Sequence, residues 1–83
     1  MNSTVFEQVR GIAADLFAMT ATKLTPDSSP ETVEAWDSTQ HLSLVLALEE
    51  RFGFQLSPEE VEQMHSLAEV ARVVESKLGS VKR

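Results

Sequence analysis

Apolar residues recur at intervals of three or four positions in three separate stretches of the chain, and this spacing limits what the chain can fold into. Side chains three and four positions apart lie on one face of an α-helix, whereas a half-buried strand would alternate. The stretches therefore predict three amphipathic helices that bury their apolar faces against one another. The residues that carry the spacing are Val5, Val9, Ile12 and Leu16, then Leu42, Val45, Leu48 and Phe52, and finally Leu67, Val70, Val73, Val74 and Leu78.

Capping residues and a glycine mark the ends of the first two helices. Ser3 or Thr4 can accept hydrogen bonds from the first free amides of the first helix. Asp37 or Ser38 can do the same for the second, and Gly53 offers a left-handed stop after it. The second helix is thereby predicted to lie between these two markers.

A short helix and a longer one are predicted in the last third of the chain. Ser57 is followed by Pro58 and two glutamates, which favours a helix start, and we expect this short helix to end near Met64. Ser66 marks the start of the last helix, and Gly79 is expected to end it. The residues after this glycine are interpreted as a frayed basic tail.

Residues 18–36 are predicted to form a long loop. They are rich in Thr, Ser and Asp, and Pro26 and Pro30 each disfavour helical geometry in the residue before them. Loops of this length are uncommon in compact domains and are often functional. We expect Leu24, Val33 and Trp36 to hold this loop against the core.

Length and composition agree with one small helical domain. The 83 residues, of which 42% are hydrophobic and 24% charged, suffice for one modest core. Ala, Leu, Glu and Val are frequent, while Gly and Pro number only three each, which favours helix. We therefore predict an all-α four-helix bundle, a single domain over residues 1–83 with an ordered core over about residues 3–79, and expect a monomer.

Charge and residue content argue against several classes of function. The net charge of -6 has the wrong sign for binding DNA, RNA or an anionic membrane, and no apolar run is long enough to cross a bilayer. By elimination we expect a cytoplasmic protein with basic partners. The chain has no cysteine and no glycine-rich phosphate loop, and His41 and His65 are best interpreted as partly exposed residues. An enzyme is poorly supported.

Ser38 differs from the other serines because it stands where the long loop meets the most apolar helix. Its hydroxyl should be exposed while its backbone is held. A phosphodiester there would lie near the positive end of the helix dipole, which favours an anion by about 0.3 to 1 kcal/mol. A serine at a helix start is most often a simple cap, however, so position alone leaves both roles open.

The segment WDSTQHLSLVLALEERFG, residues 36–53, resembles the Asp-Ser-Leu region of the acyl carrier proteins, in which an Asp-Ser pair opens the second helix. The resemblance continues through Phe54 and Leu56 into the Ser57-Pro58-Glu59-Glu60 start of a third helix. The order of helices over residues 3–79 fits as well. The resemblance thus covers nearly the whole chain and implies the fold of that family.

By this resemblance, Ser38 is the serine esterified by 4'-phosphopantetheine from coenzyme A, and the chain holds acyl intermediates as thioesters on that group without being an enzyme. Asp37 would belong to the motif that a phosphopantetheinyl transferase recognises. The other implied partners are acyl-loading and acyl-processing enzymes with basic docking patches. The residues that would meet them on the second helix are Gln40, Ser43, Leu46, Glu49 and Glu50.

Three positions depart from the pattern of the family. Thr39 stands where the motif most often has leucine, and Gln40 and Ser43 stand where many fatty-acid carriers have acids. This dilution favours a dedicated partner in a specialised acyl, polyketide, peptide or polysaccharide pathway. The rival hypotheses are an unmodified helical interaction module and, with less support, a helix-turn-helix DNA binder.

The apolar surface of the second helix is broader than one core face requires, because Leu44 and Leu46 add to it. We expect Leu44, Leu46, Leu48 and Phe52 to pack in the core of so small a bundle. A cleft that shelters an acyl chain is the alternative that the sequence leaves open.

Overall fold

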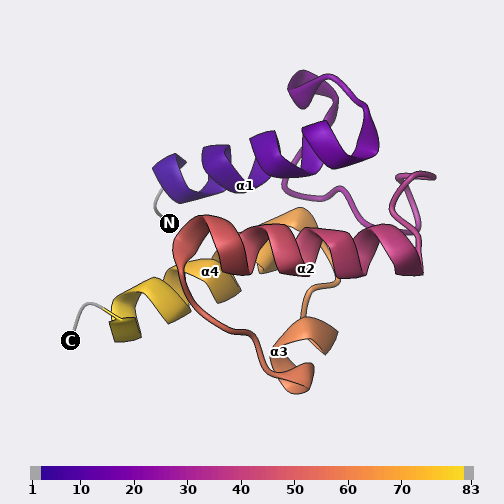
Figure 1. Ribbon diagram of the computed structural model, residues 1–83. Helices are drawn as coiled ribbons and strands as arrows, with labels where there is room; N and C mark the ends of the chain where they lie inside the picture. Colours follow the sequence, from indigo (N-terminus) through magenta and orange to yellow (C-terminus); the bar gives the residue numbers. More distant parts are fainter. Residues whose placement is uncertain (1–2, 82–83) are drawn as a thin grey trace.

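The computed structural model of the protein describes residues 3–81, and all regular structure within this range is helical. Figure 1 shows α1 beside α2, α4 passing behind α2 in this view, and a short α3 apart from the three long helices. The predicted all-α bundle, with a long loop before α2 and a short third helix, is confirmed. The elements are α1 (Ser3–Phe17), the 3-10 helix η1 (Ala21–Lys23), α2 (Ser38–Phe52), α3 (Pro58–Glu62) and α4 (Leu67–Val81).

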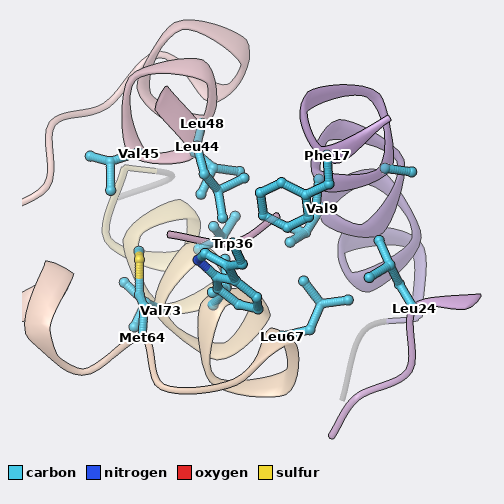
Figure 2. Packing of buried hydrophobic residues seen from close by; sticks show 14 of the residues in the cluster. Val9, Phe17, Leu24, Trp36, Leu44, Val45, Leu48, Met64, Leu67 and Val73 are labelled. Carbon is cyan, nitrogen blue, oxygen red and sulfur yellow. The ribbon is translucent and has the colours of Figure 1, made fainter. Parts of the chain in front are cut away.

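The core lies between α1, α2 and α4, and Trp36 occupies its centre. The Trp36 side chain is 1% exposed, and its ring centroid lies 5.5 Å from that of Phe17. Figure 2 shows the Trp36 ring in the middle of the cluster, between side chains from the long helices. Burying a ring of this size contributes a large share of the hydrophobic stabilisation available to so small a domain.

The buried face of α1 is turned slightly from the predicted one. Val5 and Val9 are buried as expected, but the stripe continues through Ala13 and Phe17. Ile12 and Leu16, which were predicted on this face, are only half-buried at the edge of the core. The buried stripe therefore follows every fourth residue, with Ala14 beside it, where the helix packs against α2 and α4.

The buried face of α2 also differs from the prediction. Leu44 and Leu48 are fully buried, as expected, whereas Leu42 is 61% exposed and Leu46 is 64% exposed. The core positions predicted for Leu42 and Leu46 are therefore wrong. Because Leu44 and Leu48 point into the core while Leu46 faces outward, these leucines do not line one common cleft.

The predicted ends of α2 are confirmed, while the end of α4 is not. Asp37 caps α2, and Gly53 ends it with a φ of 75°, a conformation that glycine adopts without strain. Helix α4 instead continues through Gly79 to Val81. Gly79 does not have a positive φ, so the stop predicted there is wrong. Of the tail predicted over residues 80–83, the first two residues are helical and the last two lie outside the described residues.

Helix α1 begins at Ser3, so its N-cap position falls outside the described residues, and the predicted cap at Ser3 or Thr4 does not match this start. At its other end the chain turns at Ala18, which has a φ of 55°. The amide of Met19 donates to the carbonyl of Ala14 at 2.9 Å, which closes the helix.

The long loop is anchored at both of its ends and in its middle. Leu24, Val33 and Trp36 are all buried, as predicted. Its backbone is tied as well, because the amide of Leu67 donates to the carbonyl of Ser28 at 2.8 Å. The amide of Ala68 likewise donates to a loop carbonyl, that of residue 26, at 3.0 Å. The loop thus supplies acceptors for the first amides of α4, which have none within their own helix.

Helix α3 is regular but lies on the surface. The Ser57 side chain accepts a hydrogen bond from the Glu60 amide, and the Glu60 carboxylate accepts one from the Ser57 amide at 2.8 Å, forming the predicted helix start. The hydrogen bond from the Ser57 amide is the main cause that lowers the pKa of Glu60 below its usual value. Lys77, whose Nζ lies 3.3 Å from the carboxylate, lowers this pKa further, and burial of the carboxyl opposes the shift in part. No residue between Pro58 and Glu62 is buried.

Candidate functional site

Ser38 is the first residue of α2, and its exposed side chain is not the cap of the helix. The Asp37 side chain takes that role by accepting a hydrogen bond from the Gln40 amide at 2.9 Å. The Ser38 hydroxyl makes no hydrogen bond within the part of the chain that the structure describes. The choice that the sequence left open between Asp37 and Ser38 is therefore decided in favour of Asp37.

The start of α2 suits a covalently attached phosphodiester at Ser38. The first amides of a helix have no acceptor within the helix. Asp37 accepts hydrogen bonds from two of the amides that follow it: its side chain accepts from the Gln40 amide, and its carbonyl accepts from the His41 amide. The amides of Ser38 and Thr39 have no acceptor among residues 3–81. These amides and the positive end of the helix dipole favour an anion beside the serine oxygen.

A groove with a volume of about 600 Å³ begins beside Ser38. One wall comes from α2, and the opposite wall comes from α3 and the residues that follow it. Apolar side chains from both walls border it together with two histidines and two acids. The lining residues that bear on the chemistry are Asp37, Ser38, His41, Leu42, Val61 and Met64.

A chain of hydrogen bonds crosses the base of this groove. The indole N–H of Trp36 donates to Nδ1 of His41 at 3.0 Å, so Nδ1 is the unprotonated ring nitrogen. The other ring nitrogen, Nε2, then carries the proton and donates to the carbonyl of Val61 at 3.3 Å. His41, on α2, therefore connects the core to α3, a role that no sequence pattern indicated.

Four of the five predicted docking residues line a second groove, of about 680 Å³, along the outer side of α2. Leu46 and Glu50 are exposed there, and Ser43 is half-exposed. Phe54 lies at the same groove and is buried. This outer side of α2 therefore presents an apolar residue next to acidic ones.

Two of the predicted docking residues have intramolecular partners. The Gln40 side-chain amide donates to the carbonyl of Leu16 at 3.2 Å, which links α2 to the end of α1. The Glu49 carboxylate accepts a hydrogen bond from the Leu56 amide at 2.8 Å and so holds the segment that follows α2. Both side chains therefore have a structural role, and only Glu49 also lines the outer groove.

Other kinds of site find no support within residues 3–81. No three His, Asp or Glu side chains in this range cluster closely enough to hold a metal ion. None of the described helices is both long and apolar enough to cross a bilayer. His41 is half-buried and His65 exposed, in agreement with the partial exposure expected for both.

The sequence is similar to one family model and to individual proteins of known name. The family model for the phosphopantetheine attachment site matches residues 7–74. The acyl carrier protein of Thermosynechococcus vestitus is 32% identical over 79 residues, which are 94% of this chain and 96% of that protein. The acyl carrier protein of Clostridium acetobutylicum is 33% identical over 72 residues, 87% of this chain and 94% of that one.

A solved structure has the same fold. The solution NMR structure of holo acyl carrier protein from Geobacter metallireducens gives a TM-score of 0.85 and covers 94% of this chain and 90% of its own. Its sequence is 23% identical, so the likeness is one of architecture. The arrangement of three long helices and one short helix is therefore shared with that protein.

Proposed function

This chain belongs to the acyl carrier protein family, and from that premise we propose that Ser38 carries its 4'-phosphopantetheine group. The family, the carrier function, the covalent cofactor and the absence of an enzymatic role are as the sequence predicted. The terminal thiol of the cofactor supplies the chemistry, because it holds an acyl group as a thioester. The protein supplies the attachment point and the surfaces that partners meet.

The observation that carries the proposal is that Asp37, and not Ser38, caps α2. Asp37 caps the helix, so the Ser38 hydroxyl is exposed and has no structural hydrogen bond within the described residues. Its backbone is fixed in the first turn of α2, directly after the anchored Trp36. A tethered cargo thereby gains a defined starting point and a raised local concentration at each partner.

Attachment would form one bond and break one. The Ser38 oxygen would bond to the phosphorus that bears the pantetheine part of coenzyme A, adenosine 3',5'-bisphosphate would leave, and the hydroxyl proton would be released. A base on the transferase would accept that proton, because the described structure places no side-chain acceptor within hydrogen-bond distance of the Ser38 hydroxyl.

Intact mass after incubation with coenzyme A and a broad-range phosphopantetheinyl transferase tests the proposal. The wild-type chain should gain the mass of one phosphopantetheine, and Ser38→Ala should gain none. Ser76→Ala is the matched control, because it removes an exposed serine hydroxyl on α4 that lines neither groove of α2, and it should load normally. An adduct on Ser38→Ala, or peptide mapping to another residue, would refute the assignment. If wild type gained no adduct, the result would instead favour an unmodified interaction module.

We further propose that partners dock on the outer side of α2, around Ser43, Leu46 and Glu50, with Glu49 beside them and Gln40 turned toward α1. Acyl-loading and acyl-processing enzymes with basic patches suit this surface, and the contact should weaken with salt. Reversing the charge of Glu50 with Glu50→Lys should weaken transferase or partner binding, while Glu31→Lys in the loop should not.

The departures at Thr39, Gln40 and Ser43 support a dedicated partner in a specialised pathway. Offering the holo protein malonyl groups and a housekeeping ketosynthase tests this, and efficient elongation would contradict it. A cytoplasmic location, a monomeric state and the lack of nucleic-acid or membrane partners stay predictions from the sequence.

A further inference from the structure

Ser38 and His41 are neighbours on α2, because residues three positions apart lie on the same face of a helix. A histidine in this place suggests a base that takes the proton of the serine. The contacts of the ring argue against that role. Nδ1 accepts a hydrogen bond from the indole of Trp36 at 3.0 Å, and Nε2 donates to the carbonyl of Val61 at 3.3 Å. Neither ring nitrogen is left to accept the proton of Ser38.

The hydrogen bonds of His41 instead bear on how the first turn of α2 is held. Asp37 accepts from the amides of Gln40 and His41, and these bonds shape the turn but stay within it. Two side chains of the turn reach outside it to earlier parts of the chain. Gln40 donates to the carbonyl of Leu16 at the end of α1, and His41 accepts from the indole of Trp36. The second of these bonds joins the turn to a buried side chain.

The bond between Trp36 and His41 closes a ring around Ser38, because the serine lies between these two residues in the chain. One side of the ring is fixed in the core, where Trp36 is 1% exposed and packs beside Phe17 (Figure 2). Helix ends otherwise fray, and the amides of Ser38 and Thr39 have no acceptor among residues 3–81. The ring therefore limits the positions that the serine oxygen can take.

We propose that His41 is a positioning residue for the attachment of phosphopantetheine. Through its bond to Trp36 it holds the first turn of α2 so that the Ser38 oxygen meets the phosphorus of coenzyme A in line. The transferase still accepts the proton, and adenosine 3',5'-bisphosphate still leaves. The inference rests on the proposed attachment at Ser38 and adds to it the residue that orients the serine.

A loosened first turn should slow the transfer step more than it weakens binding. Rates of group transfer depend steeply on how the attacking oxygen is aligned. The surface proposed for docking lies along the outer groove of α2, and His41 does not line that groove. Loss of the bond should therefore change the maximal rate of loading, while the affinity for the transferase changes little.

Single-turnover loading tests this, with a broad-range phosphopantetheinyl transferase in excess and coenzyme A saturating. His41→Leu keeps a side chain of similar size but removes both hydrogen bonds. Its maximal loading rate should fall about three- to tenfold, the loss expected for one hydrogen bond. The transferase concentration at half-saturation should change by less than about twofold, because docking is unaltered.

Two conservative variants decide which bond of His41 matters. The side-chain oxygen of Asn lies as many bonds from the backbone as Nδ1 of His, whereas the side-chain nitrogen of Gln matches Nε2. His41→Asn keeps an acceptor for the indole and should load within about twofold of wild type. His41→Gln keeps the donor to Val61 and should load as slowly as His41→Leu. Faster loading of His41→Gln than of His41→Asn would overturn the role of the Trp36 bond.

The tryptophan side of the bond gives an independent test, which holds even where His41→Leu fails to fold. Trp36 is the single tryptophan of the chain, so a full-length synthetic protein with 3-benzothienylalanine at this position loses only one indole N–H. The ring keeps nearly the same volume. This protein should load as slowly as His41→Leu, and the two changes together should cause no further loss, because both remove the same bond. Losses that add would contradict the proposal.

The control and the wild type separate this inference from the proposal on which it rests. Ser66→Ala removes the cap of α4 and lines neither groove of α2, so it should load at the wild-type rate. A slowed Ser66→Ala would mean that loading follows stability, and His41 would have no positioning role. Failure to load wild type at Ser38 would overturn both proposals. Normal loading of wild type with equal rates in every variant would overturn only the role of His41.

Discussion

The bundle has two long connections, residues 18–37 and residues 53–66, and the one with less regular structure buries more of its side chains. The first contains only the short η1, yet it buries Leu24, Val33 and Trp36 and gives backbone acceptors to α4. The second contains α3 with a complete capping box, yet no residue of α3 is buried, and only Phe54 and Met64 on either side of it are buried. The irregular connection is therefore the better anchored of the two.

This difference shows that regular backbone hydrogen bonding and burial of side chains do not go together in these two connections. A helix as short as α3 gains little from its own backbone bonds, whereas a buried tryptophan contributes several kcal/mol. Ser38 follows the anchored connection, and the far wall of its groove belongs to the weakly anchored one. The attachment point is thus fixed, while the wall opposite it can adjust at a smaller energetic cost.

The largest expected effect is at the anchor of the first connection. Trp36→Ala should lower the free energy of unfolding by about 3–5 kcal/mol, because it leaves a cavity in the centre of the core. Val61→Ala, in α3, should cost about 1 kcal/mol, because Val61 is only half-buried. Urea denaturation followed by far-UV circular dichroism measures both. Similar losses for the two variants would contradict the difference in anchoring.

A smaller effect is expected where the anchored connection enters α2. Asp37→Ala should cost about 1 kcal/mol, within a range of about 0.5–2, because it removes the cap of the helix. Ser38→Ala should change stability by less than about 0.5 kcal/mol, since its hydroxyl has no structural partner in the described chain. The same urea titration compares them. A larger loss at Ser38 would mean that the serine is a cap after all.

The caps of α3 and α4 compare the two kinds of helix directly. Ser57 and Ser66 each accept a hydrogen bond from the amide three residues on. Ser66→Ala should lower global stability by about 1 kcal/mol, because α4 belongs to the core. Ser57→Ala should change global stability by less than about 0.5 kcal/mol but speed hydrogen exchange of the Val61 and Gln63 amides about fivefold. Equal global effects would show that α3 is as firmly integrated as α4.

Features that depend on neighbours in sequence were predicted well. The cap, the length and the left-handed stop of α2 follow from Asp37, the apolar spacing and Gly53. The same reasoning was wrong at Gly79, where the helix continues, and it gave no signal at Ala18, which turns the chain with a positive φ. A glycine permits a stop without requiring one, because packing of the following residues can outweigh its preference.

Features that depend on distant parts of the chain could not be predicted from spacing. The bonds of His41 to Trp36 and Val61, and of Gln40 to Leu16, join elements whose relative placement is fixed only by the folded core. The same holds for Leu42, whose exposure depends on how α2 is turned against its neighbours. The resemblance indicated the candidate serine, and the structure added which groups surround it.

The smallest expected effect concerns the pH dependence of α3. The Ser57 amide, followed by Lys77, lowers the pKa of the Glu60 carboxyl below its usual value. The stabilisation is therefore present above the pKa of an unfolded glutamate and is lost as the pH falls through the lower, folded value. Carbon-13 NMR of the carboxyl should give a midpoint below that of an unstructured peptide.

The Lys77→Ala variant sharpens this last test, because it separates the two interactions. The Ser57 amide remains in that variant, so the Glu60 midpoint should rise only part of the way toward the usual value. Exchange of α3 amides, corrected for the intrinsic pH dependence of exchange, should accelerate at acid pH less in Glu60→Gln than in wild type. A midpoint that returns fully in Lys77→Ala would mean that the capping box does not hold α3 in solution, and the second connection would then be weaker still than the first.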